Sequence, residues 1–143
     1  KHENELIDIN QEGLENELSF SGNSQRLSIF NIFSKSRKTN GQAQSRRSDL
    51  SYGANYLKKI SFSPVGPFNI NFNYKYTGPY IDWDGSKNSR QKSTDIMDLS
   101  LTKNLLGNTF SLKISNLLNE RYERPATYSQ EGRQIRLSFQ KVF

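Results

Sequence analysis

Apolar and polar residues alternate along most of this chain. In the segment 68–77, every second residue from Phe68 to Tyr76 is Phe, Ile or Tyr, and the residues between them are Asn or Lys. A repeat of two residues places successive side chains on opposite faces of a β-strand. The segment therefore predicts a strand with one apolar face and one polar face.

The same repeat recurs in several other parts of the chain, and one further segment, 26–35, is apolar on both sides. Together these segments predict roughly seven strands of about 10 residues each, the length that crosses a bilayer as a tilted strand. The additional alternating segments are 14–20, 51–56, 97–102, 110–115 and 134–143.

The connections between these segments alternate in length. Short turns rich in Gly, Pro or Asn are expected at 22–25, 63–67 and 104–108, and longer polar links at 39–45, 79–94 and 118–132. Outer-membrane β-barrels have short periplasmic turns on one side and long extracellular loops on the other. The pattern therefore predicts an all-β fold, an antiparallel transmembrane β-barrel.

The low hydropathy of the chain is compatible with such a barrel. Only 33% of the residues are apolar and the mean hydropathy is −0.81. Alternating strands keep this average low while one whole face meets lipid, so the value excludes only helical membrane proteins. A Lys or Arg on the lipid face costs ~2–4 kcal/mol at the bilayer midplane and less near the rim. We therefore expect Asn71, Asn73 and Lys113 to face the lumen, and Lys58 and Lys141, which are in phase with apolar neighbours, to lie near the periplasmic rim.

Seven strands do not close a membrane barrel, because two open edges would present unpaired N–H and C=O groups to lipid. The chain also begins at Lys1, without an initiating Met or a signal segment. We therefore expect residues 1–143 to be the C-terminal part of a larger barrel whose N-terminal strands lie outside this sequence.

The end of the chain carries two specific motifs. Residues 116–122 read Asn-Leu-Leu-Asn-Glu-Arg-Tyr and resemble the Asn-Leu-Phe-Asp/Asn-x-x-Tyr motif of TonB-dependent outer-membrane receptors, at the top of the penultimate strand. The pair at 132–133 is similar to the Gly-Arg that opens the last strand of that family, and the chain ends in Phe, as such barrels usually do. The matching residues, to which the resemblance gives a structural role, are Asn116, Leu117, Leu118, Asn119, Tyr122, Gly132, Arg133 and Phe143.

Two upstream segments are also similar to this family. Gly13-Leu14-Glu15 resembles its Gly-Ile/Val-Glu strand opening, and Arg46-Arg47 resembles its Arg-Arg/Pro segment before a strand. Lys141 departs from the family, which usually has an aromatic residue two positions before the terminus, in the signal read by the barrel-assembly machinery. The spacing and the Tyr-rich strands are most similar to the cobalamin receptor branch, although siderophore receptors share the layout.

The resemblance implies a barrel of about 22 strands with a plug domain, of which this chain supplies the last seven or so. It implies a location in the bacterial outer membrane and active uptake of a bulky, scarce nutrient, either cobalamin or a ferric siderophore. The implied partners are the TonB complex, through the absent N-terminal part, and the barrel-assembly machinery, through the last strand. Outer-membrane lipid and lipopolysaccharide are further expected partners, and no cofactor is expected besides the transported ligand.

Ligand contacts are expected in the extracellular loops. Tyr80, Trp83, Asp84 and Arg90 lie in the longest link, and Tyr128 lies in the last one. An aromatic ring beside a carboxylate can bind a corrin ring or an iron chelate. The alternative for the aromatic residues is an interfacial girdle, because Trp and Tyr favour the headgroup level of a membrane.

The net charge of +6 raises two other possibilities. Much of the excess flanks residues 39–45, where a solvated loop competes with phosphate contact to lipopolysaccharide or substrate. A soluble nucleic-acid binder would gather its aromatic residues on one basic face, whereas here they alternate away from Lys75 and Lys113, so no nucleic-acid partner is expected. A passive porin shares every pattern except the family motifs and remains the main alternative.

The sequence offers little for catalysis or metal binding. His2 is the only His and there is no Cys, so neither a Ser-His-Asp triad nor a zinc site finds its ligands here. Asp82, Asp84 and Asp95 do not follow the carboxylate spacing of a calcium loop. We therefore predict no enzymatic activity and no metal site.

Overall fold

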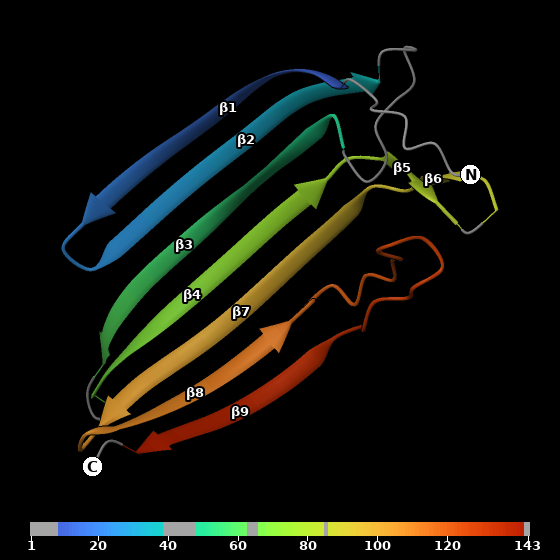
Figure 1. Cartoon of the computed structure of the whole chain (residues 1–143). Coiled ribbons are helices and arrows are strands. Elements are labelled where there is room, and N and C mark those ends of the chain that lie inside the picture. The colour runs from blue at the N-terminus through green and yellow to red at the C-terminus, as the bar shows by residue number, and fades with distance from the viewer. Residues whose placement is uncertain (1–8, 39–47, 63–65, 85, 142–143) are drawn as a thin grey trace.

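The computed structural model describes residues 9–38, 48–62, 66–84 and 86–141, and they form one curved antiparallel sheet with a small hairpin at one end (Figure 1). The seven long strands lie in the order β1-β2-β3-β4-β7-β8-β9, and β5 pairs with β6 outside this sheet. The strands are β1 (Ile9–Gly22), β2 (Gln25–Lys38), β3 (Leu50–Phe62), β4 (Gly66–Thr77), β5 (Tyr80–Trp83), β6 (Asn88–Gln91), β7 (Thr94–Leu105), β8 (Asn108–Ser115) and β9 (Gln134–Lys141).

The seven long strands confirm the all-β antiparallel prediction, with two differences. The hairpin β5–β6 lies in the segment 79–94, which was expected to be a loop. Its two strands have four residues each, which is too short for an alternation of apolar and polar residues to be recognised in the sequence. Gly13-Leu14-Glu15 lies inside β1 and does not open it, because the pairing with β2 continues from Gly22 opposite Gln25 up to Ile9 opposite Lys38.

The connections alternate in length as predicted. The strands β1 and β2 join through a short turn, as do β7 and β8, and the long links leave the opposite end of the sheet, near β5 and β6 (Figure 1). Between β7 and β8, both Leu106 and Gly107 have positive φ, at 49° and 76°. Such turns twist in the same sense as the strands that they join, so they favour a tight hairpin. The predicted link at 39–45 lies outside the described residues, as do most of the turn at 63–67, His2, Arg46-Arg47 and Phe143.

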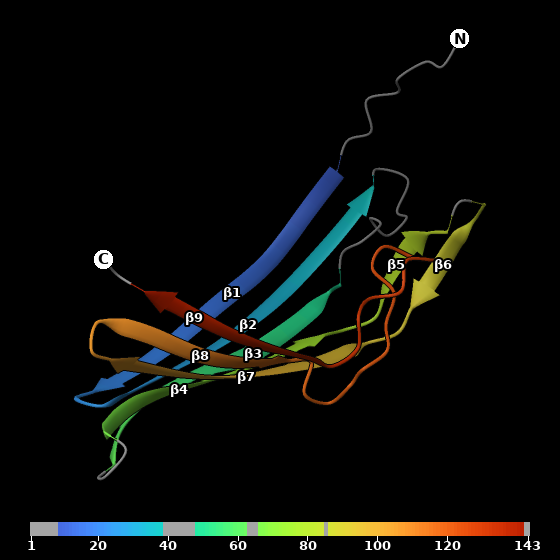
Figure 2. The ribbon, with the colours of Figure 1, turned by 90° about the horizontal axis from the view of Figure 1, so that it is seen from below.

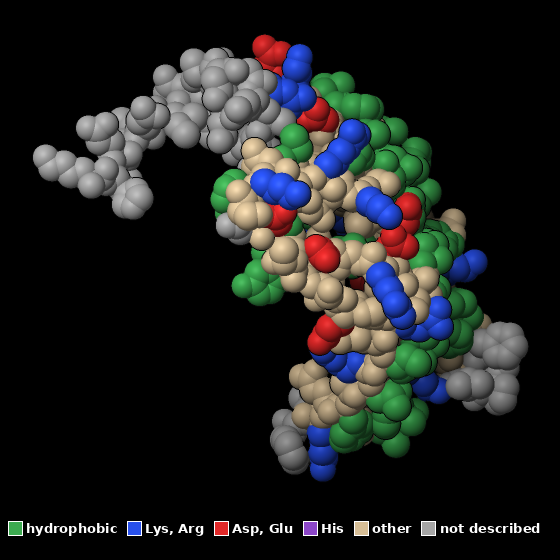
Figure 3. Space-filling model, turned by 90° about the vertical axis from the view of Figure 1, so that its right-hand side faces the viewer, with side chains coloured by type: hydrophobic (Ala, Val, Ile, Leu, Met, Phe, Trp, Pro, Cys, Tyr) green, Lys and Arg blue, Asp and Glu red, His purple; other side chains and the backbone are tan. Residues whose placement is uncertain are grey.

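Strand register places the apolar and polar phases on separate faces, called here the apolar face and the polar face. Side chains gather accordingly, with hydrophobic groups along one side of the molecule and charged groups beside them (Figure 3). Asn71, Asn73 and Lys113 lie on the polar face, and Lys58 and Lys141 lie on the apolar face close to short turns, as predicted. One cross-strand row of the apolar face is Leu18, Ile29, Ala54, Tyr74 and Met97, and the neighbouring row of the polar face is Ser19, Ser28, Asn55, Asn73 and Asp98.

The register also orients the segment 26–35, which is apolar on both sides. Ile29 and Phe33 fall on the apolar face, whereas Phe30 falls on the polar face opposite Gly53. A Cβ atom at residue 53 would lie 2.7 Å from the Phe30 ring, so this ring occupies the space that a side chain there would need. Phe30 therefore fills a gap over a glycine and does not belong to the apolar face.

The apolar face is uncovered in the part of the chain that the structure describes. Leu18 is 62% exposed and Leu137 is 78% exposed, and no second layer formed by the described residues lies against the apolar face of the curved sheet (Figure 2). A soluble antiparallel sheet buries its apolar face against another layer. Here the described buried apolar side chains are Tyr80 and Ala126, and both belong to the long-link end. No helix among the described residues is long and apolar enough to cross a membrane.

Candidate ligand-binding site

The hairpin β5–β6 is docked on the last link of the chain, residues 116–133. The Asp82 carboxylate is fully buried, and it accepts hydrogen bonds from the Ala126 amide at 2.7 Å and from the Trp83 amide at 2.9 Å. The Tyr80 hydroxyl donates to the Glu123 carbonyl oxygen at 3.1 Å. Amide-to-carboxylate hydrogen bonds are among the stronger ones in proteins, and burial strengthens them. The hairpin and the last link therefore form one packed unit at the long-link end.

The turn of this hairpin is closed by Asp84. Its carboxylate accepts hydrogen bonds from the backbone amides of Lys87 and Ser86, at 2.9 and 3.0 Å, and from the Ser86 hydroxyl at 2.8 Å. These donors, led by the Lys87 amide, hold the pKa of Asp84 below its ordinary value because they favour the charged form. The carboxylate is thereby engaged within its own turn.

Two clefts of about 300 Å³ each border the docked hairpin. The first is lined by Tyr80 and Arg90 together with the strand-end residues Arg37 and Asp49. The second lies between residues 89–94 and residues 120–123, and its charged lining residues are Arg90, Lys92, Glu120, Arg121 and Glu123. Arg90 is the one described residue that lines both clefts.

A third cleft, of about 210 Å³, opens on the polar face beneath the hairpin. It is lined by Glu15, Lys75 and Arg124, with Tyr80 shared with the first cleft. The Ser34 hydroxyl, which also lines it, is buried and has no hydrogen-bond partner in the described part of the chain. Buried polar atoms are normally paired. This cleft therefore offers charged groups of both signs and a hydroxyl to a polar ligand.

Arg37 and Asp49 make a bidentate ion pair at the edge of the first cleft. Two guanidinium nitrogens lie 2.7 and 3.2 Å from the two carboxylate oxygens. The hydrogen bonds from Arg37 lower the pKa of Asp49, because they favour its charged form. Both side chains are partly exposed, so solvent screens the pair, and it orients the two groups more than it stabilises the fold.

The structure brings together only part of the ligand set predicted from the sequence. Tyr80 and Arg90 line the same cleft, whereas Asp84 closes the hairpin turn. Trp83 is 52% exposed, Tyr128 is 66% exposed, and neither lines these clefts. The expected ligand set did not include Glu15, Ser34, Lys75 or Arg124, and the available signal for the last three was their place toward the long-link end of a strand or in a long link. Arg37 belongs to the basic residues that flank 39–45, for which phosphate contact was one of the two expectations.

The motif residues at the end of the chain tie the two ends of the last link together. Asn116 is 5% exposed, its side-chain amide donates to the Glu120 carbonyl oxygen at 2.8 Å, and its side-chain oxygen accepts from the Glu120 amide at 2.9 Å. The Asn119 side-chain oxygen accepts from the Arg133 amide at 2.9 Å. A Cβ atom at residue 132 would lie 2.7 Å from that oxygen, which accounts for Gly132.

Further bonds anchor the motif on the sheet. The Leu117 amide donates to the Met97 carbonyl oxygen at 2.7 Å, and the Leu117 carbonyl oxygen accepts from the Arg133 guanidinium at 3.0 Å. The Tyr122 carbonyl oxygen accepts from the Gln130 amide at 2.8 Å. Leu118 is half exposed. These contacts close the base of the link that carries the docking site for the hairpin.

The three aspartates considered for calcium have separate partners. The Asp82 carboxylate accepts a hydrogen bond from the Ala126 amide of the last link, and the Asp84 carboxylate accepts one from the Lys87 amide of its own turn. The Asp95 carboxylate accepts a hydrogen bond from the Tyr74 hydroxyl at 2.5 Å. Within the described ranges no three His, Cys, Asp or Glu residues are grouped as a metal site requires.

No protein-family model matches the sequence, and no curated protein matches it significantly. The solved structures that are similar in fold include a chain of the FpvAI-pyocin S2 complex and the ferripyoverdine receptor of the outer membrane of Pseudomonas aeruginosa bound to ferripyoverdine. For each, the TM-score is 0.78 at 12% sequence identity, and the match covers 93% of this chain but only 19% of the other. The chain therefore has the antiparallel all-β fold of one part of an outer-membrane receptor barrel.

Proposed function

We propose that this chain is the C-terminal part of the barrel of a TonB-dependent receptor, which imports a ferric siderophore across the bacterial outer membrane. The observation that carries the proposal is the fold shared with the ferripyoverdine receptor over 93% of the chain. The motifs at residues 116–122 and 132–133 support it independently, because their hydrogen bonds build the base of an extracellular link. The uncovered apolar face is the surface that such a barrel turns toward lipid.

A ferric siderophore is a better cargo than cobalamin. The cobalamin branch, which the strand spacing favoured, has no support from the similar structures, and one of these is described with ferripyoverdine bound. The clefts beside the hairpin carry several cationic groups, among them Arg90, Lys92 and Arg121. Cationic groups of this kind attract and orient an anionic iron chelate. Tyr80, Trp83, Asp84, Arg90 and Tyr128 remain our proposed ligand residues.

Transport then has two steps: the extracellular loops bind the iron chelate, and the TonB complex exerts force on the receptor from the periplasmic side. The docked hairpin and last link hold the chelate at the mouth, and the TonB complex acts on the N-terminal part of the receptor. Lipid and lipopolysaccharide surround the apolar face, and the barrel-assembly machinery reads the last strand. Such a receptor binds and passes its cargo without chemical change, so the proposal involves no enzymatic step.

Uptake by cells that carry the full-length gene tests the proposal. We expect uptake of a ferric siderophore that stops when the proton gradient is abolished. Arg90→Gln should weaken siderophore binding about tenfold, the value of one lost charge-assisted contact. Arg26→Gln, on the polar face beside a short turn, is the matched control and should leave binding unchanged. Gradient-independent leakage of many small solutes would instead identify a passive porin.

A further inference from the structure

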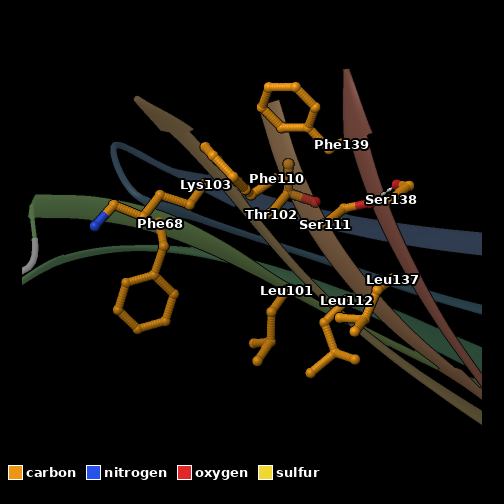
Figure 4. Close-up of a pocket in the computed structure, with 10 residues that line it drawn as sticks. All are labelled: Phe68, Leu101, Thr102, Lys103, Phe110, Ser111, Leu112, Leu137, Ser138 and Phe139. Atoms are coloured by element: carbon orange, nitrogen blue, oxygen red, sulfur yellow. Dashed lines mark hydrogen bonds between the residues drawn. The ribbon is translucent and has the colours of Figure 1, made fainter. Parts of the chain in front are cut away.

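The apolar face carries a groove of about 530 Å³ near the short turns (Figure 4). Its walls are two adjacent cross-strand rows, one with Phe110 opposite Phe139 and the other with Leu112 opposite Leu137. The two Phe rings lie 4.9 Å apart between centroids and form a continuous wall. The volume falls within the ~300–1,000 Å³ typical of sites that hold small ligands, and the lining is almost wholly apolar. The groove therefore suits a hydrocarbon chain.

Lysines of the apolar face lie at the same end of the sheet. Lys103 is paired with Phe110 and lines the groove, Lys141 is opposite Asn108 beside a short turn, and Lys58 is opposite Gln25 beside another. They lie on β3, β7 and β9, which are alternate strands in the sheet, so they are roughly 10 Å apart across it. Figure 4 shows the Lys103 side chain reaching past Phe68, away from the leucines of the groove.

Charges of the apolar face are distributed differently at the two ends of the sheet. The described acidic residues of its strands are Glu12 and Asp95, and both lie at the long-link end. Glu12 is opposite Lys35 there, and the Asp95 carboxylate accepts a hydrogen bond from the Tyr74 hydroxyl. Near the short turns, the charged residues among the described strand residues of this face are all lysines. This end is therefore complementary to anions, and the other end is not.

We propose that the groove and this row of lysines bind an anionic phospholipid of the periplasmic leaflet. One acyl chain lies in the groove between the Phe and Leu rows, and the phosphate contacts the ammonium group of Lys103. Lys58 and Lys141 contact the phosphates of adjacent lipids. Lysine stems lie along apolar surface while their charged ends reach the headgroup level, so each places a cation where phosphate is densest. The proposal rests on the proposed function, because that function sets the short turns on the periplasmic side.

Native mass spectrometry of the full-length protein tests this site. The purified protein is titrated in detergent with phosphatidylglycerol and, separately, with phosphatidylcholine of the same acyl chains. We expect tighter first binding of phosphatidylglycerol, and Lys103→Gln should lower its association constant about fivefold, the value of one lysine at an anionic surface. Lys113→Gln, on the polar face of the neighbouring strand, is the control and should change neither constant. Leu137→Phe narrows the groove and should weaken the binding of both lipids.

Three results would overturn the proposal: equal binding of the two lipids by the unaltered protein, equal effects of Lys103→Gln and Lys113→Gln, or lipid-free dimers, which would make this face an interface between copies. Uptake by the same cells separates the proposal from the function on which it rests. Gradient-dependent siderophore uptake without a preference for phosphatidylglycerol refutes the lipid site alone. Uptake that ignores the gradient refutes the transport function, whatever lipid is bound.

Discussion

Asn116 holds the base of the last link through both its side chain and its backbone. The side chain makes two short hydrogen bonds to the backbone of Glu120, and the residue has φ of 51°, in the left-handed region. Replacing it with Ala removes the two bonds and keeps a Cβ in the left-handed conformation, as Asn does. Replacing it with Gly removes the same bonds but no longer strains the backbone. The pair of variants therefore separates the two contributions.

The magnitudes follow from these contacts. Each bond has a net value of about 1 kcal/mol, so the side chain contributes about 2 kcal/mol to the closed link. The left-handed conformation costs a residue with a Cβ atom ~1–2 kcal/mol, whereas Gly adds ~0.4–1 kcal/mol through the greater freedom of the open state. Asn and Ala both bear this strain, so we expect Asn116→Ala to lower the free energy of opening by about 2 kcal/mol through the lost bonds. Asn116→Gly should lower it by about 1 kcal/mol, because Gly relieves the strain.

Amide hydrogen exchange of the full-length protein measures this opening directly. The Arg133 amide donates to the Asn119 side chain, which both variants keep, so its exchange rate reports the local opening equilibrium. We expect a faster rate in both variants, with Ala exceeding Gly by about fivefold, which corresponds to a difference of about 1 kcal/mol. Exchange at Phe72, in the middle of β4, is the internal control and should not change. Equal rates in the two variants would refute the backbone contribution, and unchanged rates in both would refute the role of the side chain.

Three further predictions concern the hairpin and the sheet. Asp82→Asn should free the hairpin from the Ala126 amide and speed its cleavage by added protease about tenfold, in line with a charge-assisted bond; unchanged cleavage would contradict the docking. The pKa of Asp84 is lowered, so the order of the hairpin turn should be complete above the ordinary value near ~4 and should be lost only as the pH falls through the lowered value; an inflection in amide exchange above that value would refute this. Gly53→Ala places a Cβ against the Tyr74 carbonyl oxygen and should cost ~1–3 kcal/mol in urea unfolding; an unchanged midpoint would show that the strands have room.

The sequence by itself determined the class of fold and the face of most side chains. A strand has only two faces, so the period of two in 68–77 was enough to separate Phe72 from Asn73. The cost of a charge in lipid then placed Lys113 on the polar face and Lys58 beside a short turn, and the register agrees. These inferences needed only local pattern and a rule about solvent.

Only the tertiary structure decided the orientation of Phe30, the existence of the hairpin and the composition of the clefts. The strand register puts Phe30 on the polar face, and Gly53 on the neighbouring strand leaves room there for its ring. Asp82 reads in the sequence as a solvated loop residue, yet it is buried because the hairpin meets a link more than forty residues later, at Ala126. The docking of one link on another depends on how the links are arranged in space, and neither the periodicity nor the composition of the sequence predicts that arrangement. For the same reason Arg37 and Arg90 line one cleft although the sequence gives no sign that they are neighbours.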